Sequence, residues 1–351
     1  MEMHQYQKSY DKLSFTAEQK ARIAANAARE ASTVSRKTRK NHHVLGKIAA
    51  AACLVSILTV TAEAAGIPTP VSEILSPIFG GAVAQTEVID QIGRPIDASD
   101  TDNGVTIRAE AIIGDRYNAC IVFSVTRDDG TPLLPENIPA EQLRLGDFGD
   151  IRLVQSGGAH GSARFRDEIP GDNQLQYICT ISSDEPLNKG TAKVEFQDLS
   201  YWDEASGESV PVVEGHWKFR FDVDYADSSV RLGNGETFSQ EGMQFTITDI
   251  YVSPVGIRLD YEVDSEVQWS NAPSGRLPEE DRLQMERYME NVEILLVKKD
   301  GTVIDISNTG GSIRPENGKT YCSKSTVFSD ILLLEEVESV QIGGIPFPIG
   351  R

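Results

Sequence analysis

The hydrophobic and polar positions of this chain form one continuous apolar block near the N-terminus, followed by a long series of alternating segments. The fifteen residues from Ile48 to Ala62 include no charged side chain. As a helix they would rise roughly 22 Å, which is less than the ~30 Å hydrocarbon core of a bilayer. Extension to Val44 and Ile67 closes the gap, so the pattern predicts a transmembrane helix over residues 44–67.

Charge on the two sides of the block predicts its orientation. Ten Lys and Arg against four Asp and Glu precede Ile48, whereas 23 against 49 follow Lys47. The positive-inside rule then places residues 1–43 in the cytoplasm as a head and exports the body, which gives a single-pass protein of the cell membrane. The lipid bilayer is therefore an expected partner. The acidic body would be repelled by nucleic acid, and we expect no nucleic-acid partner.

The alternative for the apolar block is a cleaved signal peptide. Its length suits an h-region, and Ala62-Glu63-Ala64 resembles an A-x-A cleavage site. The segment before it, ending at Lys47, is far longer than a normal n-region. We therefore expect an uncleaved anchor; a soluble buried helix is a third, blander interpretation.

Two shorter helices are predicted beside the span. In the head, Thr16 and Gln19 form a capping box for a helix over residues 16–32, which is either a solvated helix or a docking helix for a cytosolic partner. A juxtamembrane amphipathic helix is predicted within residues 68–84. Thr69 would cap it, and Gly80 would end it, unless Pro77 ends it sooner. Its apolar residues lie at i, i+3, i+4, i+7 and i+8: Val71, Ile74, Leu75, Ile78 and Phe79. That face could lie on the outer membrane surface or pack on the next domain.

The body carries an internal repeat. The stretch from Gly104 aligns without gaps with the stretch from Gly242, at an offset of 138 residues. The aligned apolar pairs are Ile107 with Phe245, Ile121 with Leu259, Phe123 with Tyr261, and Val125 with Val263. Two further blocks, from Ile151 and from Val194, match blocks from Ile294 and Val340. The order is kept, so we predict two copies of one domain, at residues 85–226 and 227–351.

Period-two alternation predicts that both copies are built from strands. Trp217, Phe219, Phe221 and Val223 alternate with charged residues, which is typical of half-buried antiparallel strands. About six or seven short strands per copy suit an immunoglobulin-like size. The predicted fold class is mainly β, with two tandem immunoglobulin-like β-sandwiches outside a single N-terminal transmembrane helix. A polar insertion before Glu293 in the second copy is compatible with a short helix.

The order of these elements resembles a known family. A polar N-terminal helix leads to one Ala-rich span, then to "SDTDNGVTIRAEAI" from Ser99 and "YNACIVFSV" from Tyr117. This pattern resembles the family named domain of unknown function 4179, found in Firmicutes and Actinobacteria, with an immunoglobulin-like C-terminal companion. The resemblance implies a membrane-anchored, anti-sigma-factor-like regulator that acts in envelope signalling. It implies no catalytic residue.

The sequence offers little that could carry chemistry. His160 lies in a Gly-rich stretch that matches no nucleotide-binding or hydrolase motif and reads as a hairpin loop, while His216 reads as a strand end. Asp97, Asp100 and Asp102 could in principle hold calcium, but their spacing is not that of an EF-hand, and a solvated turn is expected.

The remaining acidic and thiol groups also indicate no site. Glu279, Glu280 and Asp281 read as a solvated helix start. Cys120 and Cys179 have opposite strand phases, so we expect no disulfide between them. No CxxC spacing occurs. We expect no enzyme, no catalytic residue, no metal and no cofactor.

These patterns support two hypotheses for the function. A third hypothesis is supported by no motif. The first is a sigma-factor regulator or envelope sensor that would bind a cytosolic sigma factor through residues 16–32 and an unknown extracellular ligand through its body. The second is a cell-surface adhesive or ligand-binding module with an inert N-terminal tail. A hydrolase with a site assembled from distant loops is the third.

Overall fold

The computed structural model describes residues 70–145, 151–153, 157–270 and 277–350. The predicted head, its helix over residues 16–32 and the predicted span over residues 44–67 lie outside the described residues. Within the described ranges, no helix is long and apolar enough to cross a membrane. All of these ranges belong to one compact unit, Ser56–Arg351.

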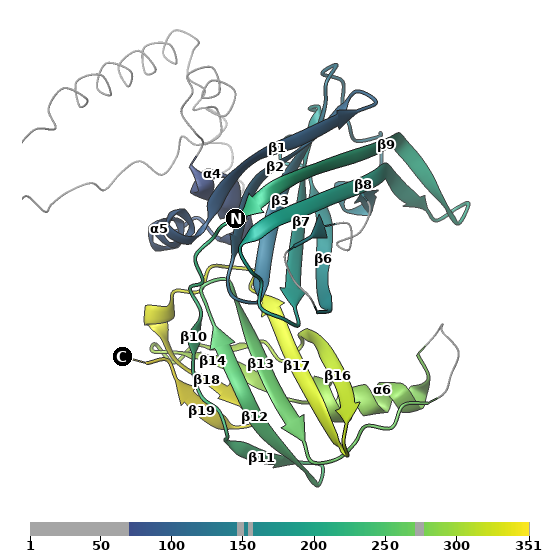
Figure 1. The fold of residues 1–351 in the computed structure, drawn as a ribbon. Coiled ribbons are helices and arrows are strands. Elements are labelled where there is room, and N and C mark those ends of the chain that lie inside the picture. Colours follow the sequence, from purple (N-terminus) through teal and green to yellow (C-terminus); the bar gives the residue numbers. More distant parts are fainter. Residues whose placement is uncertain (1–69, 146–150, 154–156, 271–276, 351) are drawn as a thin grey trace, which may run out of the picture. The chain divides into compact units, whose positions relative to one another are not determined.

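The described chain is mainly β and forms several antiparallel sheets (Figure 1). Strands β1 to β9 make up what we call the N-terminal half, and β10 to β19 the C-terminal half. The N-terminal half follows two helices. In order, these elements are α4 (Val71–Phe79), α5 (Val83–Ile92), β1 (Arg94–Asp102), β2 (Val105–Gly114), β3 (Asn118–Arg127), β4 (Leu143–Leu145), β5 (Ile151–Arg152), β6 (Ala159–Arg166), β7 (Gln174–Ser183), β8 (Gly190–Asp203) and β9 (Glu208–Val223).

The C-terminal half contains one helical insertion, α6 followed by a π-helix. Its elements are β10 (Val230–Arg231), β11 (Thr237–Gln240), β12 (Met243–Val252), β13 (Gly256–Val263), α6 (Glu279–Met285), the π-helix (Glu286–Glu290), β14 (Ile294–Lys298), β15 (Val303–Asp305), β16 (Gly310–Glu316), β17 (Lys319–Val327), β18 (Val337–Ile342) and β19 (Ile345–Pro348). The short helix expected in this insertion is therefore confirmed. Short 3₁₀ turns occur at Ala140–Gln142 and Leu334–Glu336.

The two halves share a strand order. The N-terminal half has the sheet β1-β2-β3-β7-β6, and the C-terminal half has β10-β12-β13-β17-β16, with β11 also paired to β12. The first aligned blocks form β2–β3 and β12–β13. The second and third blocks pair with each other in both halves, since Ile151 lies opposite Val194 and Leu296 opposite Val340. The repeat in the sequence therefore falls on equivalent strands.

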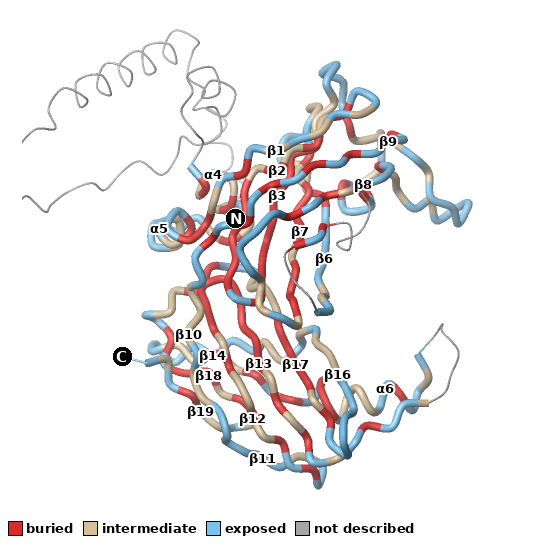
Figure 2. The backbone as a smooth tube through the Cα atoms, in the orientation of Figure 1, coloured by how far each residue is buried: buried red, intermediate tan, exposed pale blue. Residues whose placement is uncertain are grey.

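One hydrophobic core lies in each half. In the N-terminal half, Ile121 and Phe123 of one sheet meet Phe196 and Trp217 of the other in a single buried cluster. In the C-terminal half, Leu259 and Tyr261 occupy the same positions in a second cluster. Figure 2 shows that buried positions run along the strands. The alternation expected along β9 is confirmed, because its aromatic residues are buried and the charged residues between them are exposed.

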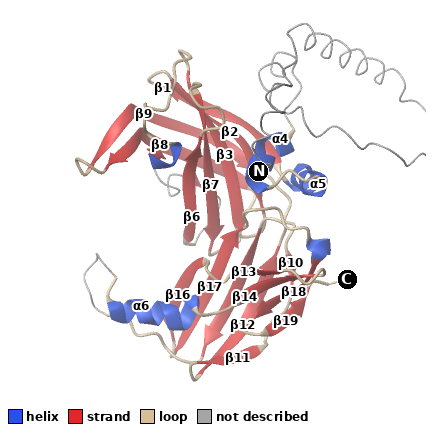
Figure 3. Cartoon of the chain, turned by 180° about the vertical axis from the view of Figure 1, so that it is seen from behind, coloured by secondary structure: helices blue, strands red, loops and turns tan. Residues whose placement is uncertain are grey.

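Helix α4 packs on protein. It buries Val71, Leu75 and Phe79 in a third cluster, with Ile113 of β2 and Ile331 of the C-terminal half. Figure 3 shows α4 and α5 beside β2 and β3. The first residue of the helix is Val71, and Pro70 takes the cap position, whereas the sequence predicted Thr69 there. Gly80 ends the helix as predicted, at φ 95°, and Pro77 lies inside it.

Helix α5 lies at the predicted start of the first β domain and was not expected from the sequence. The boundary at residue 85 falls inside Val83–Ile92, and β1 begins only at Arg94. The sequence signal for α5 is weak, because its N-cap residue Ala82 has no capping side chain and only Ile89 and Ile92 are buried. The side chain of Gln85 caps the backbone N–H of Ala82 at 3.2 Å. The apolar face of α5 is thus too narrow for periodicity alone to reveal.

We predict that Leu75→Ala destabilises the fold by about 2–5 kcal/mol, because the side chain is fully buried between α4 and both halves. Chemical denaturation of the full-length chain measures the change. The control Val83→Ala, at a side chain 74% exposed on α5, should change stability by less than ~0.5 kcal/mol. Equal effects of the two substitutions would show that α4 does not pack as described.

Candidate functional site

The junction of the two halves is formed by two equivalent hairpin turns. Asp115 lies in the β2–β3 turn and Ser253 in the β12–β13 turn, 138 residues later. Asp115 Oδ1 accepts the backbone N–H groups of Tyr117 (2.8 Å) and Asn118 (2.7 Å). Ser253 Oγ likewise accepts those of Val255 (2.9 Å) and Gly256 (3.0 Å). Each turn is therefore closed by a short polar side chain at its first position.

These two turns bind one another. Ser253 Oγ donates to Asp115 Oδ2 at 2.6 Å, and both side chains are buried. The approach requires a glycine, because a Cβ at Gly256 would meet Asn118 Nδ2 at 2.9 Å and Thr326 O at 2.4 Å. Burial raises the pKa of Asp115, while the hydrogen bonds from Ser253, Tyr117 and Asn118 oppose that shift.

Arg258 adds a second polar bridge across the junction. It is 5% exposed and makes two hydrogen bonds to Asp260, at 2.9 and 2.7 Å. Its Nη1 donates to the backbone oxygen of Ser183 in the N-terminal half at 2.8 Å, and its guanidinium lies 4.7 Å from the ring centre of Tyr117. Burial raises the pKa of Asp260, and Arg258 opposes the shift. Arg258 is thus paired with Asp260 in the C-terminal half and also binds a backbone oxygen of the N-terminal half.

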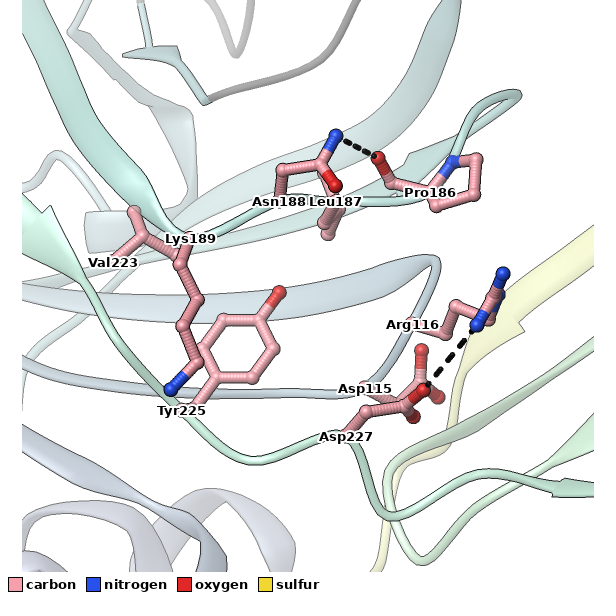
Figure 4. A pocket seen from close by; sticks show the side chains of 9 residues that line it. All are labelled: Asp115, Arg116, Pro186, Leu187, Asn188, Lys189, Val223, Tyr225 and Asp227. Atoms are coloured by element: carbon pink, nitrogen blue, oxygen red, sulfur yellow. Dashed lines mark hydrogen bonds and ion pairs between the residues drawn. The ribbon is translucent and has the colours of Figure 1, made fainter.

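A small cavity of about 230 Å³ lies next to this junction (Figure 4). Tyr225 points into it, and its buried hydroxyl has no hydrogen-bond partner among the described residues. Burial raises the pKa of that phenol. Asp115 and Asp227 lie on the opposite side, where Asp227 pairs with Arg116 at 3.9 Å. The volume is below the usual range for ligand pockets and suits a few solvent molecules.

A larger groove of about 570 Å³ lies between β6 and β7 of the N-terminal half and β17 of the C-terminal half. Its size is typical of ligand pockets. Six hydroxyl-bearing residues line it: Ser162, Thr180, Ser182, Ser325, Thr326 and Ser329. His160 and Arg164 add positive or polar groups, and Ile78, Phe79, Val327 and Phe328 add an apolar wall. This groove is the candidate functional site.

The expectation for His160 was wrong. The residue lies in strand β6, and its Nε2 donates to the backbone oxygen of Ser325 at 3.2 Å. The Gly-rich sequence here serves strand packing, because a Cβ at Gly161 would meet Thr180 O at 2.0 Å. The structure thus brings His160 into the groove, where the sequence predicted a loop.

The three aspartates before Gly104 belong to a strand, where the sequence predicted a solvated turn. They lie on β1, and Asp100 and Asp102 accept the backbone N–H groups of Lys218 and His216, both at 2.8 Å. Their carboxylates therefore join β1 to β9 in the other sheet. The strand end predicted at His216 was also wrong, since the residue lies inside β9. Over the part of the chain that the structure describes, no cluster of three or more His, Cys, Asp or Glu could hold a metal.

Cys120 and Cys179 lie on adjacent strands with opposite faces. Cys179 pairs in register with Ile121, so Cys179 faces the core of the N-terminal half while Cys120 faces α4 and α5. Both are free and buried, and burial raises the pKa of the Cys120 thiol to about 12. The opposite strand phases predicted for the two cysteines are confirmed.

The acidic start of α6 divides between two roles. Glu279 and Glu280 are exposed, as expected. Asp281 is buried and accepts both the backbone N–H and the hydroxyl of Ser270, each at 2.7 Å. The sequence missed this role because the partner lies eleven residues away across the insertion.

Lys324 is a buried cation that the sequence analysis did not identify. Its side chain is fully buried, and Nζ donates to the backbone oxygens of Met289 (2.8 Å) and Val292 (3.1 Å). It therefore satisfies carbonyls at the C-terminal end of the π-helix, where positive charge is favourable. Burial lowers its pKa to about 8.

Comparisons with known proteins add little. No protein-family model matches the chain. No curated protein matches it. Among solved structures, the conserved domain protein from Bacillus anthracis matches with a TM-score of 0.48 and 15% identity, over 77% of this chain and 83% of that one. A likeness at this level carries no argument about function.

We predict that Asp115 and Ser253 are energetically coupled. Asp115→Ala should cost about 3 kcal/mol, because it leaves buried N–H groups without an acceptor. In a double-mutant cycle with Ser253→Ala, measured by chemical denaturation, the two effects should depart from additivity by about 0.5–3 kcal/mol. Purely additive effects would contradict the direct contact between the turns.

Lys324 should make stability depend on pH. Below about pH 8 the amine is charged in both the folded and the unfolded chain, so folding carries its full desolvation cost. Between about 8 and 10.5 the folded chain binds fewer protons than the unfolded chain, and the free energy of unfolding rises with pH.

Lys324→Met removes this contribution and is the test. Chemical denaturation across that window should give a smaller rise for the variant than for the native chain. Parallel profiles for the two proteins would show that Lys324 does not titrate there.

Proposed function

We propose that this chain is a membrane-anchored extracytoplasmic sensor that regulates a cytosolic sigma factor. In this proposal residues 44–67 span the membrane, residues 16–32 bind the sigma factor, and the two halves are tandem immunoglobulin-like sandwiches that bind a ligand without catalysis. The family resemblance and the charge difference between the head and the body support it.

One observation carries the proposal: α4, which follows the predicted span almost at once, is built into the junction. Arg166 of β6 donates to the backbone oxygen of Pro77 at 2.8 Å. Ile331 of the C-terminal half donates its backbone N–H to Phe79 O, also at 2.8 Å. The helix is thus held by both halves at once. A change in how the halves meet would act on α4 and, through it, on the anchor.

The second candidate is an adhesive surface module. It is favoured by Trp202, which is 55% exposed on the long β8–β9 hairpin. Exposed tryptophan is common in binding surfaces. In this case the head would be only a tail.

Deletion of residues 1–35 discriminates between the two functions. The regulator should lose its effect on sigma-dependent transcription, measured with a reporter, while the protein remains in the membrane fraction. An adhesive module should keep its surface activity. As a direct test, a pull-down with residues 1–40 should recover a sigma factor, and recovery of no transcription factor would overturn the regulatory proposal.

A further inference from the structure

We infer that the groove between β6, β7 and β17 binds an anionic carbohydrate, a sugar unit that carries a phosphate or a carboxylate. This inference deepens the proposed function by naming a ligand. It rests on the proposed function only for the role of the carbohydrate as the signal. Binding itself can be measured without the anchor or the head, so the two proposals can fail separately.

The charges along the groove favour an anionic ligand. Outside the predicted head and span the chain is strongly acidic, yet none of the described residues that line the groove is Asp or Glu. Arg164 lines it, and within the described ranges no ion pair or hydrogen bond involves its guanidinium. By contrast Arg166, two residues on, binds Pro77 O and lies 3.8 Å from Glu168. Arg164 is exposed to solvent. A guanidinium beside hydroxyls, in a groove whose described lining has no carboxylate, favours an anion.

Hydroxyl groups are dense along the groove, and several are already bonded within the protein. The hydroxyls of Ser162 and Thr180 bond each other at 2.9 Å, and Ser182 Oγ donates to Asn118 Oδ1 at 2.7 Å. Ser325 Oγ lies 3.4 Å from His160 Nε2. Because these protons are engaged, the hydroxyl oxygens remain mainly as acceptors. Such a surface matches a ligand that itself carries many hydroxyls. A bare anion would use few of them.

The groove also has an apolar wall. Ile78 of α4 and Phe328, which follows β17, are partly exposed beside the polar groups, whereas Phe79 is buried. A sugar ring has an apolar face of C–H groups as well as a polar rim, so it can use both surfaces. The cavity volume of about 570 Å³ leaves room for more than one sugar unit.

Other occupants fit less well. A metal ion needs oxygen or nitrogen ligands, and the described lining of the groove has no carboxylate. Nucleic acid would be repelled by the net negative charge of the body. A neutral glycan would make no use of the charge of Arg164. A peptide could add to the edge strand β6, but it would make little use of the hydroxyls.

The location of the groove gives the ligand a physical effect. A ligand that binds β6 and β17 together bridges the two halves beside Phe79 of α4. Its binding energy would favour one arrangement of the junction over others by its differential affinity for them. Because α4 packs on the junction, a change in that arrangement would alter the contacts of α4.

The test is a calorimetric titration of the full-length chain in a detergent without sugar. The probes are glucose 1-phosphate, glucuronate, glucose and inorganic phosphate. The two anionic sugars should bind, and glucose and phosphate should each bind at least about tenfold more weakly, a difference of ~1.4 kcal/mol. If no probe binds, or if glucose or phosphate binds as tightly as the anionic sugars, the inference is overturned.

Two variants locate the site. Arg164→Gln should weaken the anionic sugars about tenfold and leave glucose unchanged, because it removes a charge-assisted bond. Thr180→Val should weaken both anionic sugars and leave phosphate unchanged. Arg220→Gln is the matched control, since Arg220 is exposed on β9 away from the groove. Equal affinities for the native chain and Arg164→Gln would overturn the inference, and so would a loss with Arg220→Gln.

Discussion

The contact between Asp115 and Ser253 is the constraint on which the junction depends. A carboxylate and a hydroxyl in equivalent turns each close their own hairpin and then bind each other. Because both groups are buried, neither can be exchanged for water without cost. The two halves are thereby joined through the same position of each copy, as in a symmetric dimer whose subunits share one chain. The groove and the contacts of α4 lie beside this point.

Much of the strand architecture could be predicted from sequence, since it follows from period-two alternation and from the repeat. The offset of 138 residues aligns Asp115 with Ser253, yet nothing in the alignment says that aligned positions touch. The groove is hidden for the same reason: Arg164 and Thr180 come from the β6–β7 hairpin, whereas Ser325 comes from β17 of the other half. His160 was misread because Gly157, Gly158 and Gly161 suggest a loop, whereas Gly161 allows close approach of β7.

The prediction failed differently at α5 and at Asp281. Helix α5 has two buried residues and an N-cap residue, Ala82, without a capping side chain, so its local signal is small and tertiary packing decides its state. Asp281 looks like part of an exposed acidic run, and only the position of Ser270 shows that its carboxylate is buried and bonded. In both cases the structure is decided by a contact with residues that lie outside the short stretch of sequence on which the prediction was based.

The two copies differ at two positions where a buried cysteine of the first is replaced by a buried cation in the second. Cys120 and Arg258 are equivalent in register, as are Cys179 and Lys324. Cys120 packs under α4 and α5, which the second copy lacks among the described residues, while Arg258 turns to the backbone of Ser183. Cys179 fills a core, while Lys324 satisfies carbonyls at the end of a helical insertion that only the second copy has over the same ranges. Lys324 is thus bonded within its own half, whereas Arg258 is bonded across the junction. The two halves are related by pseudo-symmetry but differ in the contacts that they make around the junction. Helix α4 therefore packs against an asymmetric junction.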